Sequence, residues 1–433
     1  MIEAVHTRLS SAALKRCIPP APMGAPADDS PLGTSASSLP GLPLSDIFQA
    51  AARAGVDTPP PDGAPSPSDP QAPPMKKWTI LVYAAADNNL YPYEYENLRD
   101  IEKVGSTDQL NVVTQFDEGG PGASRMLMQK VSTPDGSIGS PVVENIGEVD
   151  MASPETLSNF IKWGMEKYPA EHTMLIINDH GNGWRGCVQD EGADTFMTLP
   201  TVREGLEAAQ AATGKKLDVI GFDACLMGMA EVAHELRDCA DFMVGSQETE
   251  GAAGWPYSNI LTSEMLGHLD EKLAARLPMA PRDVAVAAVQ RAAGLPDDLP
   301  TMAAYDLSKE GALKSAVDVL AQKIEASPIT SKALKGIAKE TQGFYEYKDL
   351  YDFADRLQGE KTAGPELSEA AAQVKGAIDG MVIASQHNAH YPGAHGVSIE
   401  LTRHPEGYSA LQFAQDGGWM TAQDKIGLRA QAC

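Results

Sequence analysis

The 433-residue sequence lacks any apolar run of about eighteen residues, although 43% of its residues are hydrophobic. A helix needs about twenty apolar residues to cross a bilayer, so membrane insertion is not expected. The N-terminus, MIEAVHTRLSSAALKRCIPPAPMGA, also lacks the apolar stretch of about seven residues found in secretory signals. These absences predict a cytoplasmic protein, with secretion an alternative only if translation starts elsewhere.

Positive charge is also scarce. The chain has 34 Lys and Arg residues against 59 Asp and Glu residues, a formal net charge of -25. Nucleic acids are bound by clustered basic residues that replace counterions on the phosphates, and no basic stripe is present. We therefore expect no nucleic-acid partner, and an acidic surface that favours cationic partners.

Cysteine is rare, and several catalytic signatures are missing. The five cysteines form no CxxC pair or Cys/His ladder, which predicts reduced thiols and no zinc site. The sequence has no GxSxG elbow, no GxxxxGK phosphate loop and no GxGxxG after a strand, which argues against serine hydrolases, NTPases and dinucleotide enzymes. Three histidines before the last predicted strand fit a polar loop better than a metal site: His387, His390 and His395.

What is present begins with a long proline-rich segment. Residues 1–75 hold 15 of the 31 prolines, mixed with Ser, Gly, Ala and Asp. Such a segment buries too little apolar surface to offset its chain entropy, so we predict disorder. A tether is the simplest role, and a pro-segment or partner-binding arm is the alternative.

From Lys76 onward, apolar strands alternate with amphipathic helices. Near-continuous apolar runs predict strands covered by helices on both faces, and hence an α/β fold with a mostly parallel sheet. The catalytic core is assigned to 76–265, and a helix-rich region to 266–433 with a late strand at 396–401 returning to the core. The predicted strands of the core are 78–87, 110–118, 173–181, 217–224 and 241–248, with helices at 154–168, 202–214 and 225–240.

Two of these strands end in reactive side chains. LIINDHGNGW places His180 just past one strand, and VIGFDACLMG places Asp223 and Cys225 just past another. Ligands gather at the carboxyl ends of parallel strands, so neighbouring strands would bring His180 and Cys225 together.

This pair predicts acyl transfer by a cysteine nucleophile. A nearby imidazole or helix N-terminus lowers a thiol pKa, and Cys225 is expected where a helix begins. The backbone N–H groups of Gly181 and Cys225 are candidate oxyanion donors, and Asp223 is a candidate for the substrate pocket. The residues alone also allow non-catalytic roles: a structural His180, an inert Cys225 and an Asp223 that caps a helix.

Longer blocks resemble the clostripain-like cysteine peptidases, family C11 of the caspase, gingipain and legumain clan. The resemblance covers about residues 76–410 in the right order. The blocks that carry it are KKWTILVYAAADNNL, INDHGNGW, GFDACLMGMAEVA, SQETEGAAGWPY and HYPGAHGVSIEL.

The resemblance implies a caspase-like three-layer α/β/α sandwich that hydrolyses protein and peptide substrates after Arg or Lys. His180 and Cys225 would form the dyad, Gly181 and Cys225 the oxyanion hole, and Asp223 would receive the basic side chain. Further residues of the pocket wall would be Glu248, Glu250 and Trp255. The rival hypotheses are a catalytically silent scaffold of the same fold and a hydrolase of non-peptide acyl bonds.

Two features of the family are in question for this chain. Relatives are commonly clipped after a basic residue between the histidine and the cysteine, yet residues 186–202 contain no Lys or Arg. Self-cleavage at Lys76 or Lys77 is an alternative hypothesis. No cofactor is required by the sequence, although the resemblance allows calcium at the acidic loops 87–89 or 117–122, which lack EF-hand spacing.

Overall fold

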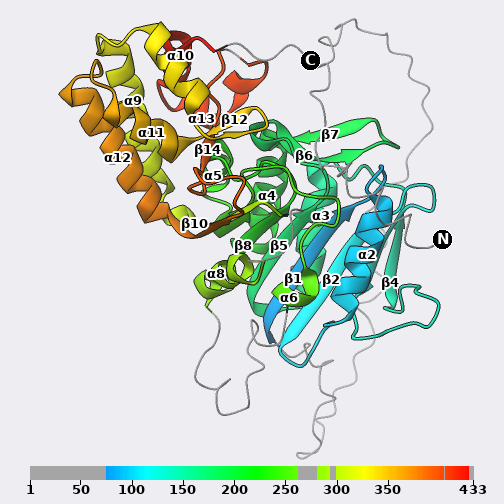
Figure 1. The fold of residues 1–433 in the computed structure, drawn as a ribbon. Coiled ribbons are helices and arrows are strands. Elements are labelled where there is room, and N and C mark those ends of the chain that lie inside the picture. The colour runs from blue at the N-terminus through cyan, green and yellow to red at the C-terminus, as the bar shows by residue number, and fades with distance from the viewer. Residues whose placement is uncertain (1–74, 262–279, 293–298, 404, 429–433) are drawn as a thin grey trace, which may run out of the picture. The chain divides into compact units, whose positions relative to one another are not determined.

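Figure 1 shows the fold in a computed structural model, which describes residues 75–261, 280–292, 299–403 and 405–428. All of these residues belong to one compact unit. The prediction for the proline-rich segment therefore lies outside the described residues, except for Met75 at its end.

The described residues form a nine-stranded sheet in the order β13-β10-β9-β8-β5-β1-β2-β3-β4. The five strands from β9 to β2 are parallel, and the pairs outside them are antiparallel. The bounds are β1 (Lys76–Ala85), β2 (Leu110–Asp117), β3 (Ala123–Leu127), β4 (Val142–Gly147), β5 (Ala170–Asn178), β8 (Leu217–Asp223), β9 (Ala240–Gly245), β10 (Thr301–Asp306) and β13 (Val382–His387).

Successive side chains of a strand point to opposite sides, so strands that are apolar throughout present an apolar surface on both faces of the sheet. Helices cover both of these faces. In β1, Leu81 and Tyr83 join one apolar cluster, whereas Ile80 and Val82 join a second cluster. The first cluster is closed by α3 (Pro154–Lys167), α4 (Leu199–Thr213) and α5 (Ala230–Leu236), and the second by α2 (Tyr91–Glu102), α6 (Tyr257–Ile260) and α8 (Pro281–Ala292). The predicted three-layer α/β/α architecture is confirmed.

Local signals explain where the crossover helices begin. Ser153 accepts the Glu155 N–H at the start of α3, and Pro154 occupies the first helical position. Thr198 accepts the Thr201 N–H at the start of α4, and Gly214 ends that helix with φ +68°. These are the caps that satisfy the unpaired backbone groups of a helix end.

The C-terminal region extends both apolar clusters, the second through α8 and β10 and the first through its later helices, and has no separate core among the described residues. Contacts between α5 and α9 join the region to the catalytic sheet, and the boundary predicted at residue 265 falls in the undescribed range 262–279. The helices are α9 (Glu310–Ala326), α10 (Ser331–Glu340), α11 (Leu350–Gly359), α12 (Pro365–Met381), α13 (Gln412–Gln415) and α14 (Trp419–Ile426). None of the described helices is both long and apolar enough to span a bilayer.

The predicted late strand at 396–401 differs from the observed one. It is reduced to β14 (Ser398–Ile399), which pairs with β12 (Tyr347–Asp349) in a small sheet completed by β11 (Gly343–Phe344). The strand that returns to the central sheet is β13, antiparallel to β10. Periodicity could not distinguish the two, because it carries no information about which strand is the partner.

Candidate active site

The strands β5 and β8 bring the two predicted reactive segments to the same edge of the sheet. They pair in parallel with Asn178 opposite Asp223, and the Asp179 N–H donates to the Asp223 carbonyl at 3.3 Å. His180 follows Asn178 by two residues, as Cys225 follows Asp223. The strand register therefore places the segments that carry His180 and Cys225 side by side at the same edge of the sheet.

Gly181 shows how closely these segments approach. A Cβ atom at this position would lie 2.3 Å from the Cys225 carbonyl oxygen and 2.7 Å from the Cys225 nitrogen. Real Cβ atoms do not come that near to backbone atoms, so a side chain at residue 181 would push the segments apart. The glycine is required for contact between the histidine loop and the cysteine backbone.

The surroundings of Cys225 correct one prediction. The helix α5 begins at Ala230, not at Cys225, which lies in a turn followed by Leu226 at φ +70°. The turn is held by tertiary hydrogen bonds that override helical periodicity: Leu226 N–H donates to Glu248 O at 3.2 Å, and Gly228 N–H to Ser246 O at 2.7 Å. A helix N-terminus therefore does not stabilise the thiolate.

Backbone groups contact the sulfur instead. The Glu250 N–H donates to Cys225 Sγ at 3.3 Å. The Glu250 carbonyl oxygen lies 3.8 Å from the same sulfur and can accept from the thiol, so the backbone of one residue offers both a donor and an acceptor to Cys225. Cys225 itself is fully buried, and so is the Glu250 side chain.

His180 is oriented by a residue that sequence reasoning did not find. Its Nε2 atom lies 2.8 Å from Asn89 Oδ1, in the loop after β1. The neighbouring Asn88 donates from Nδ2 to Asp179 Oδ1 at 2.9 Å, and Asp179 also accepts the Gln189 N–H at 2.6 Å. Burial raises the pKa of Asp179 well above its usual value. The sequence signal that could have identified Asn89 was the polar triplet DNN that follows a buried strand.

Asp223 lies on the opposite face of β8 from the α5 helix. Both of its oxygens accept the Trp255 N–H at 3.1 Å, and Oδ2 also accepts the Tyr257 hydroxyl at 2.9 Å. The side chain is fully buried. Asp223 therefore does not cap α5, which starts only at Ala230.

The segment 246–257 provides the other predicted wall residues. Trp255 packs over β8, where a Cβ atom on Gly221 would lie 2.8 Å from the indole ring. The Glu248 carboxylate accepts the Thr249 N–H at 2.8 Å and a hydrogen bond from Tyr391. Burial, followed by the Glu248 charge, raises the pKa of Tyr391 to about 12. The loop before β14 thus reaches the site, an arrangement not foreseen from the sequence.

The carboxylates of the two acidic loops accept hydrogen bonds from nearby backbone N–H groups. Asp87 accepts the Gly192 N–H at 3.0 Å, and Asp117 accepts the Gly119 N–H at 3.0 Å. Burial, with nearby Glu148, Asp190 and Asp87, raises the pKa of Asp117 to about 7. Within the described ranges, no three His, Cys, Asp or Glu side chains are arranged to hold a metal ion. We assign no chemical step to calcium.

The basic residues that flank the segment 186–202, and those at the start of β1, are held by ion pairs or backbone hydrogen bonds. Arg185 pairs with Glu346 at 3.0 Å, and Arg203 with Glu235 at 3.0 Å. Between them, β6 (Gly186–Asp190) and β7 (Thr195–Thr198) form a hairpin. Lys76 and Lys77 are bonded into β1 through their backbone N–H groups. Since peptidases cut extended, accessible chain, these bonds disfavour cleavage at 76 or 77. Lys215, by contrast, is exposed and lies between α4 and β8.

Other candidate residues have structural roles. Burial raises the pKa of the Cys239 thiol to about 12 and that of Cys187 further, so neither is a reactive thiol. His234, on α5, is buried between Glu310 at 2.8 Å and Asp416 at 3.1 Å. His395 pairs with Asp349 at 3.1 Å, as a polar loop residue would.

A thiol and an imidazole on adjacent strand ends of a three-layer α/β/α protein are the arrangement of a cysteine hydrolase. The model of the clostripain family matches residues 82–393. The chain belongs to the clostripain family, peptidase family C11, and is a cysteine endopeptidase.

Individual relatives agree with this assignment. The chain is 25% identical to clostripain of Hathewaya histolytica over 410 residues, which covers 77% of this chain and 76% of the relative. Among solved structures, a secreted C11 cysteine protease from Bacteroides thetaiotaomicron with an irreversible peptide inhibitor matches with TM-score 0.58 and 21% identity, covering 80% of this chain and 99% of that one. An inactive zymogen C11 protease from Parabacteroides distasonis matches with TM-score 0.59 and 23% identity, covering 79% and 99%.

Proposed function

We propose that this endopeptidase cleaves protein and peptide substrates after Arg or Lys, with Cys225 as the nucleophile and His180 as the proton carrier. One observation carries the specificity: a fully buried carboxylate, Asp223, precedes Cys225 by two residues on the strand that leads to it. A buried carboxylate attracts a cationic side chain far more strongly than an exposed one, because water does not screen it.

His180 removes the thiol proton, and the sulfur attacks the carbonyl carbon of the bond to be cut. The imidazolium favours the thiolate before attack, and the Glu250 N–H donates to the sulfur at 3.3 Å. Asn89 fixes the imidazole through Nε2. In the neutral histidine, a hydrogen bond to the amide oxygen requires the proton on Nε2, which leaves Nδ1 as the base.

The tetrahedral intermediate carries its negative charge on the former carbonyl oxygen. We assign the backbone N–H groups of Gly181 and Cys225 as its donors, an assignment supported by the close approach of Gly181 to the Cys225 backbone. The intermediate collapses to a thioester as His180 protonates the leaving amine. Water, activated by the same histidine, then hydrolyses the thioester and restores the thiol.

The test uses fluorogenic peptides that end in Arg or Lys before the reporter group. Wild type should turn them over, Cys225→Ala should lose all turnover, and Cys239→Ala, which removes another buried thiol, should retain it. Turnover by Cys225→Ala would show that the nucleophile is wrong. No turnover of Arg or Lys peptides by wild type, with or without calcium, would overturn the proposed substrate preference.

A further inference from the structure

The short helix α6 receives its N-terminal cap from a different helix. It follows Pro256, which supplies no side-chain acceptor for the first turn. The backbone N–H groups at a helix start need such acceptors. Asp100, near the end of α2, provides one: its Oδ2 accepts the Ser258 N–H at 2.6 Å.

The capped stretch is also the one that holds Asp223. Trp255 supplies its backbone N–H and Tyr257 its hydroxyl to the Asp223 carboxylate. Tyr257 directly precedes Ser258, and its own N–H donates to Trp255 O at 2.9 Å. A shift of Ser258 is therefore transmitted to both donors of Asp223 through one turn of backbone.

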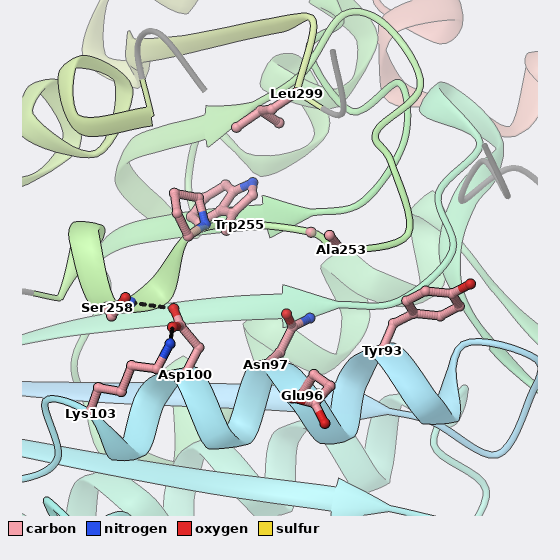
Figure 2. A pocket seen from close by; sticks show the side chains of 11 residues that line it. Tyr93, Glu96, Asn97, Asp100, Lys103, Ala253, Trp255, Ser258 and Leu299 are labelled. Carbon is pink, nitrogen blue, oxygen red and sulfur yellow. Dashed lines mark hydrogen bonds and ion pairs between the residues drawn. The ribbon is translucent and has the colours of Figure 1, made fainter. Parts of the chain in front are cut away.

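A hollow borders the stretch on its α2 side, next to this hydrogen bond. A hollow of about 490 Å³ separates α2 from residues 253–258 (Figure 2). Figure 2 shows the Asp100–Ser258 hydrogen bond between the two walls, with Lys103 on the same carboxylate at 2.8 Å. The hydrogen bond is therefore a polar link between α2 and the stretch at the rim of the hollow, beside the apolar contacts of Tyr257 and Ile260 in the second cluster.

We propose that Asp100 is a specificity-positioning residue. By capping α6, it fixes residues 255–258, so that Trp255 and Tyr257 hold the Asp223 carboxylate where a basic substrate side chain meets it. Asp100 itself touches neither Cys225 nor Asp223. The inference rests on the proposed preference for Arg or Lys and names a residue outside the pocket that controls it.

The test is a set of three variants assayed with an Arg peptide. Asp100→Ala removes the acceptor, and the KM for the Arg peptide should rise about three- to tenfold, the range expected for a lost helix cap. Its kcat and its rate of thiol labelling by iodoacetamide should stay within about twofold of wild type. Asp100→Asn keeps an amide oxygen for Ser258 and should restore the KM. Lys103→Ala removes only the ion pair and should resemble wild type.

The outcomes separate this proposal from the proposed function. An active wild type with an unchanged KM in Asp100→Ala overturns the positioning role alone. Equal losses in kcat and thiol labelling would mean that Asp100 merely supports the fold, which also overturns it. A wild type that does not cleave Arg or Lys peptides overturns both proposals. Should Asp100→Ala fail to fold, Asp100→Leu fills the same space without an acceptor and is measured instead.

Discussion

Replacing Asp223 with Asn tests the origin of substrate specificity with the smallest change of shape. The amide keeps one oxygen to accept the Trp255 N–H, and the Tyr257 hydroxyl can rotate to accept from the new NH₂ group. The local packing should therefore survive. The substitution removes the negative charge that we propose receives the substrate cation.

The magnitude follows from the burial of the carboxylate. Two unit charges about 4 Å apart interact by about 4 kcal/mol at an effective dielectric constant of about 20. Since about 1.4 kcal/mol is a tenfold change in rate, kcat/KM for an Arg peptide should fall about a thousandfold. A matched Gln peptide, which carries no charge, should change by less than about tenfold, so the preference for Arg over Gln should nearly vanish.

The assay compares kcat/KM for Arg, Lys and Gln peptides in wild type and Asp223→Asn, together with the rate of thiol labelling. Labelling should persist, because Cys225 and His180 are unchanged. Glu248→Gln is the matched control: it neutralises another buried carboxylate of the same wall, one that already accepts the Thr249 N–H and a hydrogen bond from Tyr391. If Asp223→Asn keeps the Arg-to-Gln ratio of wild type, Asp223 does not receive the substrate cation.

Two further predictions follow from the contacts around the site. Asn89→Ala removes the hydrogen bond to His180 Nε2 and should lower kcat about tenfold with little change in KM. This corresponds to the loss of about 1 to 1.5 kcal/mol from the hydrogen bond that orients the imidazole. A kcat within twofold of wild type would contradict this role. Asp117→Asn should raise the Tm in EGTA at pH 8, because burial raises the folded pKa of Asp117 to about 7 and its ionisation above that pH destabilises the native state. The gain should shrink as the pH falls from about 7 toward 4, because over this range the folded wild type takes up a proton on Asp117 while the unfolded chain stays ionised. A scanning fluorimetry series that shows the same gain at pH 5 and pH 8 would refute the assignment.

Much of the active-site framework could be predicted because it depends on local pattern and strand register. Apolar runs identified the strands that became β5 and β8, and parallel pairing places the residues that follow them at one edge. The positions of His180 and Cys225 follow from that pairing alone. The need for Gly181 is a consequence of the same pairing, since any Cβ there would meet the Cys225 backbone at the end of the neighbouring strand.

The rest was decided by contacts between segments far apart in the chain. Periodicity extended a helix back to Cys225, but hydrogen bonds to Ser246 and Glu248 hold that stretch as a turn. The same holds for the link from Asn89 to His180 and for that from Asp100 to Ser258. A sequence specifies which groups are polar and which segments are regular. Which distant donor satisfies which acceptor is settled only when packing brings the two together and removes the water that would otherwise compete.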